Sequence, residues 1–246
     1  MTTLTIERRK SKRAWILMAV AMLLIGLNIL NGIGNYLSNE VTFRAQGLDW
    51  IAIWGQAGLL WSVLFFPFLI TLRAASLTRM EHEQANWRRM GSYGALGRIY
   101  GGKVVLLGGF VLLCQVLFVA AVIVVSLALG FTLTFADVWA MACWGLLGVV
   151  GGMSIAALQL FVGVLVRSFA TTVAIGLIAS IGSLMVTLVV PVLAVIYPYA
   201  QISVGMRVRA LNWPGAPETV GYLVMNVVLI LVAVFLGRLA LHRRER

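Results

Sequence analysis

Long runs without charged side chains constrain this chain more than any other feature of its sequence. From Val104 to Val166 the only charged residue is Asp137, and from Ser168 to Met206 there is none. A helix crosses the hydrocarbon core of a bilayer with about 20 apolar residues. The first run is long enough for two such helices, and the sequence FTLTFAD around Asp137 supplies a turn between them. The pattern therefore predicts an all-α, polytopic membrane protein.

The charge-free runs fit six transmembrane helices in a single transmembrane domain, residues 1–246. Charged residues make up 11% of the chain and its mean hydropathy is +0.99, whereas soluble domains carry roughly 25% charged residues. The basic amino end precedes an apolar run with no cleavage pattern, so we expect an uncleaved first span rather than a signal peptide. Pro198 is expected to close the fifth span. The predicted spans are, with approximate bounds, residues 14–35, 51–72, 104–130, 139–165, 172–196 and 219–237.

The positions of the basic residues predict the orientation of these spans. Sixteen of the 19 Lys and Arg residues fall in the amino tail, the loop 73–103, the turn at Arg167 and the carboxyl end, which share one side of the membrane. The other side holds Arg44, Arg207 and Arg209. Because cytoplasmic loops are enriched in Lys and Arg, we expect both termini and the loop 73–103 in the cytoplasm. The net charge of +11 thus reflects topology and does not predict nucleic-acid binding.

The loop 73–103 is the only long polar segment between two strongly apolar regions. Thr78 is followed three residues later by Glu81, which is the spacing of a capping box and predicts that a helix begins at Thr78. We expect a short helix of about three turns that lies outside the hydrocarbon between spans two and three. The alternative is a solvated, positively charged loop with partial helicity.

The charges of this helix suit its dipole. Glu81 and Glu83 would lie at its positive end, and Arg88 and Arg89 at its negative end. Gly91 follows as a helix stop.

Polar and small residues inside the spans predict contacts between helices. The amide side chains either form interhelical hydrogen bonds, which is the commoner role, or line a substrate path. Gly148 with Gly152, and Gly176 with Ser180, are spaced to let helix backbones approach closely. Between spans five and six, the outer loop is expected to form short helices on or in the outer leaflet, with Tyr197, Tyr199 and Trp213 at the interface. The candidate path residues are Asn28, Gln115, Gln159 and Asn226.

The sequence gives no support for catalysis by this chain. Gly97 to Lys103 fits the G-x-x-x-x-G-K part of a phosphate loop, but Val104 stands where a Ser or Thr would hold magnesium. The chain has two histidines and two cysteines, Cys114 and Cys143, at spacings that form no metal motif. No Asp, Glu, Lys or Arg lies deep within a predicted span, which argues against an ion-coupled carrier. We therefore expect neither a catalytic residue nor a bound metal on this chain.

The loop 73–103 resembles that of ABC-2 permease subunits, and among them the short permeases of lantibiotic-immunity and bacitracin-resistance transporters. The shared pattern is Glu-x-Glu, a Trp a few residues later with a basic residue after it, and then Arg and Lys before span three. The family usually has a Leu-Pro-Val-Ser-Arg-like turn, and residues 92–98 of this chain contain no Pro. The matching residues are Glu81, Glu83, Trp87, Arg88, Arg98 and Lys103.

The resemblance implies a permease subunit of an ATP-driven exporter in a bacterial cytoplasmic membrane. Two ABC ATPase subunits would bind ATP and magnesium, and a second permease subunit, identical or different, would complete the path. The helix after span two would be the coupling helix docked in the ATPase, with Trp87 as its anchor and with Arg88 and Arg89 pairing with acidic residues. An amphipathic peptide, antibiotic or lipid is the expected cargo. The alternative is a membrane anchor or assembly protein that docks a soluble partner without transport.

Overall fold

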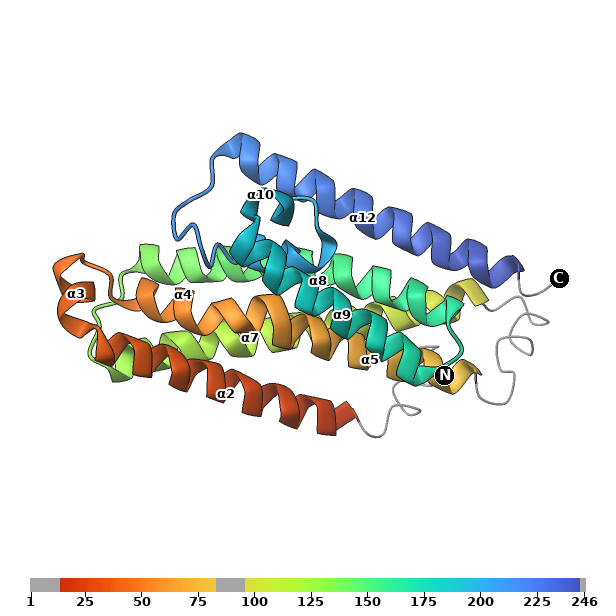
Figure 1. Ribbon diagram of the computed structural model, residues 1–246, viewed down its shortest axis with the longest axis horizontal. Helices are drawn as coiled ribbons and strands as arrows, with labels where there is room; N and C mark the ends of the chain where they lie inside the picture. The colour runs from red at the N-terminus through yellow and green to blue at the C-terminus, as the bar shows by residue number, and fades with distance from the viewer. Residues whose placement is uncertain (1–13, 83–95, 244–246) are drawn as a thin grey trace.

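The protein is a bundle of long helices, seen in a computed structural model that describes residues 14–82 and 96–243 (Figure 1). Within these two ranges, six helices are long and apolar enough to cross a membrane. Every regular element in the described ranges is helical, which confirms the predicted all-α fold and six spans. The six are α2 (Ala14–Ser38), α4 (Trp50–Leu60) continuing through a π-helical turn η1 (Trp61–Phe65) into α5 (Phe66–His82), α7 (Leu96–Ala128), α8 (Phe135–Leu165), α9 (Phe169–Val189) and α12 (Ala216–Arg243).

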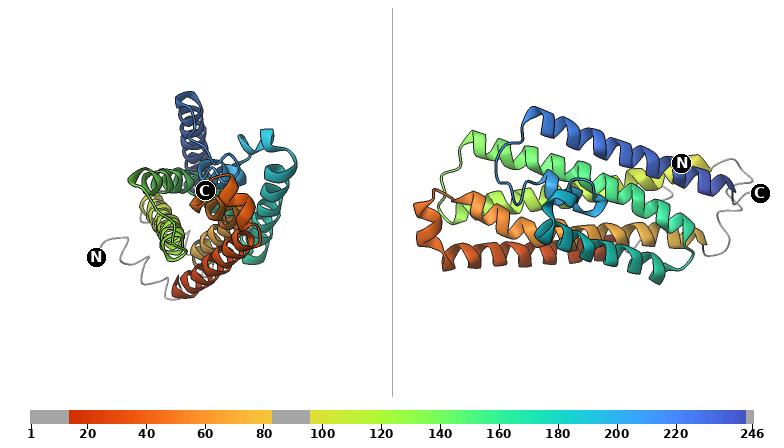
Figure 2. Two further views of the ribbon diagram at one scale, coloured as in Figure 1. Left: turned by 90° about the vertical axis from the view of Figure 1, so that its left-hand side faces the viewer. Right: turned by 45° about the horizontal axis from the view of Figure 1, so that its top comes forward.

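The second and fourth spanning helices form the centre of the bundle. The α4–η1–α5 helix and α8 are the most buried of the six, and α8 contacts α5, α7, α9 and α12. Figure 2 shows α12 at the edge of the bundle, consistent with the small part of it that is buried. The exposed side chains of the outer helices are mostly large and apolar, as expected of a surface in contact with lipid.

Aromatic side chains fill the middle of this core. The ring of Trp61 stacks on Phe66 and Phe118, with centroids 4.8 and 5.6 Å apart. The ring of Trp54 lies edge-on to Phe118 at 5.7 Å, and its indole Nε1 donates to the carbonyl of Met206 at 2.8 Å. These rings join α4, α7 and the segment before α12.

The long second span changes its hydrogen-bonding pattern next to a proline. Pro67 has no backbone N–H and crowds the carbonyl of the preceding turn, which normally breaks a helix. Here the π-helical turn Trp61–Phe65 precedes it, and such turns commonly absorb local distortions inside long helices. The helix therefore continues to His82 rather than ending near residue 72 as predicted.

The fifth span ends earlier than predicted. Helix α9 stops at Val189, and Pro191 begins the short α10 (Pro191–Ala194). The residue before a proline is driven out of the α region, and Val190 has φ −131° and ψ 67°. Pro191 rather than Pro198 thus closes this span.

The predicted turn around Asp137 is present. Gly130 adopts φ +82°, and Thr134 then caps α8 by a reciprocal capping box with Asp137. The Asp137 carboxylate accepts from the backbone N–H of Thr134 at 2.8 Å. This arrangement satisfies free donors at the start of the helix.

The two predicted small-residue faces are sites of close helix packing. A Cβ on Gly152 would lie 2.6 Å from Cγ1 of Val111 on α7, and a Cβ on Gly176 would lie 2.3 Å from Cγ2 of Thr71 on α5. At both distances an added methyl group would overlap the neighbouring side chain, so that side chain or a helix would have to shift. Glycine at these two positions therefore sets how closely α8 and α9 approach their neighbours.

The segment between α9 and α12 folds back into the bundle. It contains α10, a 3₁₀ turn η3 (Pro198–Ala200) and α11 (Gln201–Gly205). Helix α11 packs on α8, and Ile202 and Met206 are fully buried. The short helices were predicted, but Tyr199 is buried rather than at an interface.

Candidate functional site

The polar turn at the end of α5 is the place where the structure departs most from the sequence expectation. Thr78 lies inside α5 and its hydroxyl donates to the carbonyls of Ala74 and Ala75 at 3.1 and 3.2 Å. It therefore begins no helix, and the predicted capping box with Glu81 is wrong. The reason is that the apolar face of α5 continues past residue 72, so Thr78 and Glu81 fall in its last turns.

Glu81 and Lys103 form an ion pair inside the bundle. The Lys103 Nζ lies 3.0 Å from Glu81 Oε1, and both side chains are 0% exposed. The same Nζ donates to the carbonyl of Leu77 at 2.9 Å. A buried charge is tolerated only when it is paired and hydrogen-bonded. The pair joins the end of α5 to the beginning of α7, on either side of residues 83–95.

The same turn of α5 contacts two more helices. The His82 Nε2–H donates to the carbonyl of Gly163 on α8 at 2.7 Å. The guanidinium of Arg79 lies 5.7 Å from the ring centre of Phe169 at the start of α9, within the range of a cation–π contact. We call the residues Arg79, Glu81, His82 and Lys103 the loop anchor.

Close packing of small groups supports the loop anchor. A Cβ on Gly163 would lie 2.5 Å from Oγ1 of Thr78, so only glycine lets α8 approach α5 here. Beneath Lys103 in α7, the buried Tyr100 packs against Gly237 of α12, where a Cβ would lie 2.2 Å from the phenolic oxygen. The end of α5 is thus connected, directly or through α7, to α8, α9 and α12.

The predicted coupling residues divide into three groups. Glu81 and Lys103 are brought together and buried, so they cannot themselves contact a soluble partner in this state. Arg98 is exposed on the first turn of α7. The remaining four, which lie outside the described residues, are Glu83, Trp87, Arg88 and Arg89.

Two of the four candidate path residues hold the segment that folds back. Gln159 of α8 donates through Nε2 to the carbonyl of Thr172 at 2.9 Å and accepts through Oε1 from the hydroxyl of Tyr199. Burial raises the pKa of the Tyr199 hydroxyl, so it stays protonated and able to donate. Asn226 of α12 donates to Gln201 Oε1 at 2.9 Å.

Gln201 is the centre of a hydrogen-bonded network with Asn226 and the start of the segment that folds back, and no sequence pattern marked it as a site residue. Its Nε2 donates to the carbonyls of Ala194 and Val195 at 3.1 and 2.9 Å. The hydroxyl of Ser154 on α8 donates to Asn226 Oδ1 at 2.6 Å and so extends the network. A Gln between two prolines in an outer loop gives no sequence signal of burial.

The other two candidate path residues make fewer contacts. The Nδ2 of Asn28 donates to the carbonyl of Leu24 in its own helix at 2.8 Å. Gln115 on α7 is 1% exposed, and neither amide atom has a hydrogen-bond partner among the described residues. A role of any of the four in a substrate path stays a prediction.

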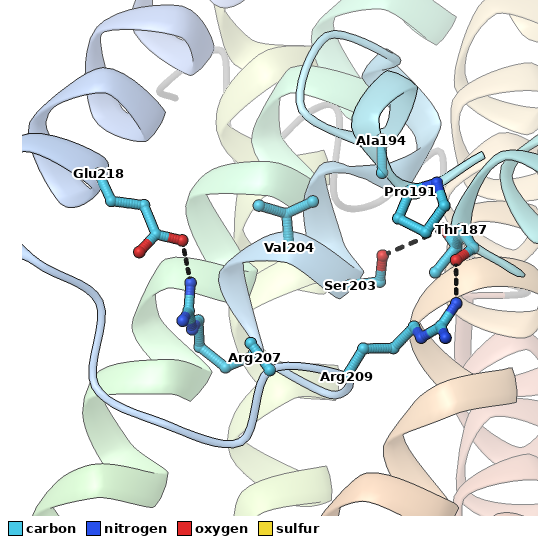
Figure 3. A pocket seen from close by; sticks show the side chains of 9 residues that line it. Thr187, Pro191, Ala194, Ser203, Val204, Arg207, Arg209 and Glu218 are labelled. Carbon is cyan, nitrogen blue, oxygen red and sulfur yellow. Dashed lines mark hydrogen bonds and ion pairs between the residues drawn. The ribbon is translucent and has the colours of Figure 1, made fainter.

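A pocket of about 170 Å³ lies beside residues 190–215, the stretch between α9 and α12 that we call the outer segment (Figure 3). Arg207 is turned toward Glu218 at the start of α12 and pairs with it, while its Nε donates to the carbonyl of Asn212 at 3.1 Å. Arg209 on the other side donates to the carbonyl of Thr187 near the end of α9. Both arginines therefore tie the outer segment to the spanning helices.

The described parts of the basic segments lie together at one end of the bundle. The beginning of α2, the loop anchor, the turn between α8 and α9 and the end of α12 are all at that end, and α3 (Glu40–Ala45) is at the opposite end (Figure 1). This arrangement is the one that six consecutive spans with both termini on one side require.

Comparison with known proteins decides the family. The model of the ABC-2 family transporter proteins matches residues 3–183, which is well over half of the chain. This chain belongs to the ABC-2 family of transporter proteins. No match is found among curated proteins, and none among solved structures.

The family makes this chain a membrane permease component of an ABC transporter and implies an ABC ATPase as its partner. The matched range of the permease contains the loop anchor and ends within α9. The outer segment and α12 lie beyond it. Within residues 14–82 and 96–243 of the permease, no three His, Cys, Asp or Glu side chains come together as a metal site.

Proposed function

We propose that this permease is the membrane-spanning subunit of an ATP-driven exporter in a bacterial cytoplasmic membrane. It moves an amphipathic peptide, antibiotic or lipid out of the cytoplasm or the inner leaflet. Two ATPase subunits, with ATP and magnesium bound, dock on the loop 73–103, and a second permease subunit completes the path. Both termini face the cytoplasm.

The buried Glu81–Lys103 pair is the observation that best supports this proposal. It holds the two ends of the polar loop together, with 3.0 Å between Nζ and Oε1. Separating these charges in a low-dielectric site is costly. A force applied to residues 83–95 therefore moves the end of α5 and the start of α7 together. It does not pull these two helix ends apart.

The other contacts of the loop anchor give this force a route into the bundle. His82 connects α5 to Gly163 of α8, and Arg79 connects it to Phe169 of α9. Closure of the ATPase pair pushes the loop, the end of α5 moves, and α7, α8 and α9 tilt with it. Access to the path then alternates between the two sides of the membrane.

A substitution at the predicted anchor tests the docking step. Aromatic anchors at interfaces typically contribute 2 kcal/mol or more, so Trp87→Ala should weaken ATPase binding roughly thirty-fold. The measurement is the binding of the purified ATPase to the permease in nanodiscs, together with ATP-dependent transport in liposomes.

Trp213→Ala is the matched control, because Trp213 is 55% exposed and its ring lies 6.1 Å from that of Trp144, in the half of α8 farther from the loop anchor. It should leave ATPase binding unchanged. If Trp87→Ala binds the ATPase and transports as the parent does, the assigned docking role is wrong.

Purification from native membranes separates transport from simple anchoring. We expect an ABC ATPase to copurify with the tagged permease, and the purified complex to move cargo only when ATP is hydrolysed. A complex that contains a soluble partner and no ATPase would favour the anchor or assembly function instead.

A further inference from the structure

The pocket beside the outer segment has charged side chains on two facing walls (Figure 3). Arg207 and Glu218 form an ion pair on one wall. Arg209 stands on the opposite wall, next to Thr187 near the end of α9. These residues come from the outer segment, α12 and α9, and all of them line the same volume of about 170 Å³. An occupant of this pocket thus has a guanidinium on one side and a carboxylate on the other.

Arg207 makes this a preformed site. Its side chain is 8% exposed, and its guanidinium donates to the carbonyl of Asn212 at 3.1 Å and to Asn212 Oδ1 as well as to Glu218. A buried charge needs such partners, and here they hold the carboxylate of Glu218 at the wall. With Arg209 included, the charged lining carries one more positive than negative group. An anion is therefore the favoured occupant.

Both walls keep hydrogen-bonding groups that the protein itself does not use. Arg209 is exposed and donates through Nη1 to the carbonyls of Thr187 and Leu188. Its Nε and Nη2 have no hydrogen-bond partner within residues 14–82 and 96–243. Glu218 is 56% exposed and accepts through Oε1, while its Oε2 has no partner in the same two ranges. One wall thus offers donors, and the other offers an acceptor.

The length of α9 places the pocket at the level of the lipid headgroups. Helix α9 has 21 residues and so rises about 32 Å at about 1.5 Å for each residue, close to the roughly 30 Å of hydrocarbon in a bilayer. Because it starts directly after the turn at Arg167, its last turn with Thr187 reaches the opposite headgroup layer. Just beyond this turn, Val189 and Val192 are 70% and 79% exposed. These two side chains are placed to contact acyl chains next to the pocket.

The charges and the depth of the pocket together define its occupant. A phosphate accepts hydrogen bonds from guanidinium groups, and a primary ammonium donates to a carboxylate. The pocket holds roughly six groups of the size of water, at about 30 Å³ each, which suits a phosphate with a short amine and excludes a peptide helix about 10–12 Å across. A free amino acid also carries both charges, but it has no apolar part to contact Val189 and Val192.

We propose that this pocket binds the headgroup of a phospholipid that carries a primary amine, with the phosphate on Arg209 and the ammonium on Glu218. The acyl chains extend along the exposed valines, and the lipid joins the outer segment to the ends of α9 and α12. Binding requires neither ATP nor the ATPase. It is therefore measured on the permease alone and does not depend on the proposed export function.

Lipid binding to the delipidated permease in detergent tests the proposal, with native mass spectrometry as the measurement. Three probes share the same acyl chains: phosphatidylethanolamine has the primary amine, phosphatidylcholine has a trimethylated amine, and phosphatidylglycerol has no amine. A fourth probe, glycerophosphoethanolamine, is the headgroup without chains. We expect phosphatidylethanolamine to bind about ten-fold more tightly than each of the others, the ratio that one hydrogen bond to a charged group produces.

Four variants assign the groups, and the melting temperature of each without lipid checks that it is folded. Arg209→Gln should lower the affinity for phosphatidylethanolamine about ten-fold, and Arg209→Lys, which keeps the charge, should restore part of it. Glu218→Gln should remove the preference for phosphatidylethanolamine over phosphatidylglycerol. Arg44→Gln is the matched control, because Arg44 is an exposed arginine that pairs with Glu40 at 2.7 Å and does not line the pocket. It should bind every probe as the parent does.

Several outcomes would overturn the proposal. Equal affinity for the three phospholipids would make the lipid at this pocket an ordinary bilayer lipid. Binding of glycerophosphoethanolamine as tight as that of the lipid would make the pocket a site for a soluble zwitterion. If Arg209→Gln bound phosphatidylethanolamine as the parent does, the lipid would lie elsewhere. A less stable Glu218→Gln that keeps the preference for the amine would restrict Glu218 to holding Arg207. None of these results bears on whether Trp87 docks the ATPase.

Discussion

The most informative residues of this protein are two charges that are hidden from solvent. Glu81 and Lys103 come from the polar loop of the sequence, yet both are fully buried and paired at 3.0 Å. Such a pair stabilises a fold weakly compared with an apolar packing of the same volume, but removing one partner is strongly destabilising. Its value here is that it fixes α5 to α7 at one point.

Removing one charge should destabilise the permease. Glu81→Gln removes the carboxylate that lies 3.0 Å from the buried Lys103 ammonium, and breaking a buried ion pair in this way costs about 3–5 kcal/mol. We expect the melting temperature in detergent to fall by roughly 6–20 °C, using about 2–4 °C for each kcal/mol in a chain of this size.

The double variant provides the control. Glu81→Gln combined with Lys103→Met removes both charges, so it should recover most of the lost stability. If the double variant is as unstable as Glu81→Gln alone, the pair is not the source of the effect. The transport activity of the stable double variant then measures what the two charges contribute to the coupling of ATP hydrolysis to transport.

Prolines and glycines decide how the helices end and how closely they pack. Pro191 closes α9, and Pro67 lies just after a π-helical turn in the second span. Gly151 of α8 faces the segment that folds back, where a Cβ would lie 2.5 Å from the carbonyl oxygen of Gln201. Because that atom belongs to the backbone, no side-chain rotation relieves the clash.

Gly151→Ala should therefore push α11 away from α8. Overpacking of this kind typically costs about 1–3 kcal/mol, and the displaced Gln201 would also lose its contact with Asn226. We expect a melting temperature lower by roughly 2–12 °C and faster proteolysis of the outer segment.

Gly109→Ala is the matched control for this element. Gly109 is a helical glycine of α7 with nothing within 4 Å of an added Cβ. Alanine is the better helix former, so this variant should be as stable as the parent or slightly more stable. If Gly151→Ala and Gly109→Ala lowered the melting temperature equally, the contact between Gly151 and α11 would not be the cause of the effect.

At the scale of the whole molecule, most of the Lys and Arg residues belong to segments at one end of the bundle. The described parts of the basic segments lie at one end, and α10 and the start of α12 lie towards the other (Figure 1). The ring of Trp213 lies 6.1 Å from that of Trp144, in the half of α8 farther from the basic end. Because cytoplasmic loops are enriched in Lys and Arg, we predict that the basic end faces the cytoplasm.

Cysteine labelling in intact cells tests this orientation. In a background with Cys114→Ala and Cys143→Ala, Trp213→Cys should react with a membrane-impermeant maleimide added outside. Arg98→Cys, which replaces an exposed side chain of α7, should react only after the membrane is permeabilised. The reverse pattern would place the loop outside the cell and exclude contact with a cytoplasmic ATPase.

The number of spans and their alternation follow from the sequence alone. Long apolar runs have one favourable state in a bilayer, because a helix satisfies every backbone hydrogen bond within itself. The sequence FTLTFAD around Asp137 marks a turn by local chemistry, so this turn was recognisable without the fold. The matching pattern around Trp87 indicated the ABC-2 family on the same local basis.

Only the tertiary structure decided which polar residues are buried and what each one contacts. Thr78 and Glu81 have the spacing of a helix start, but the apolar face of α5 continues beneath them and Lys103 neutralises the carboxylate. Gln201 lies in a loop sequence and becomes the centre of a network because α8 and α12 provide its partners. These outcomes depend on neighbours distant in the chain, and a local pattern carries no information about them.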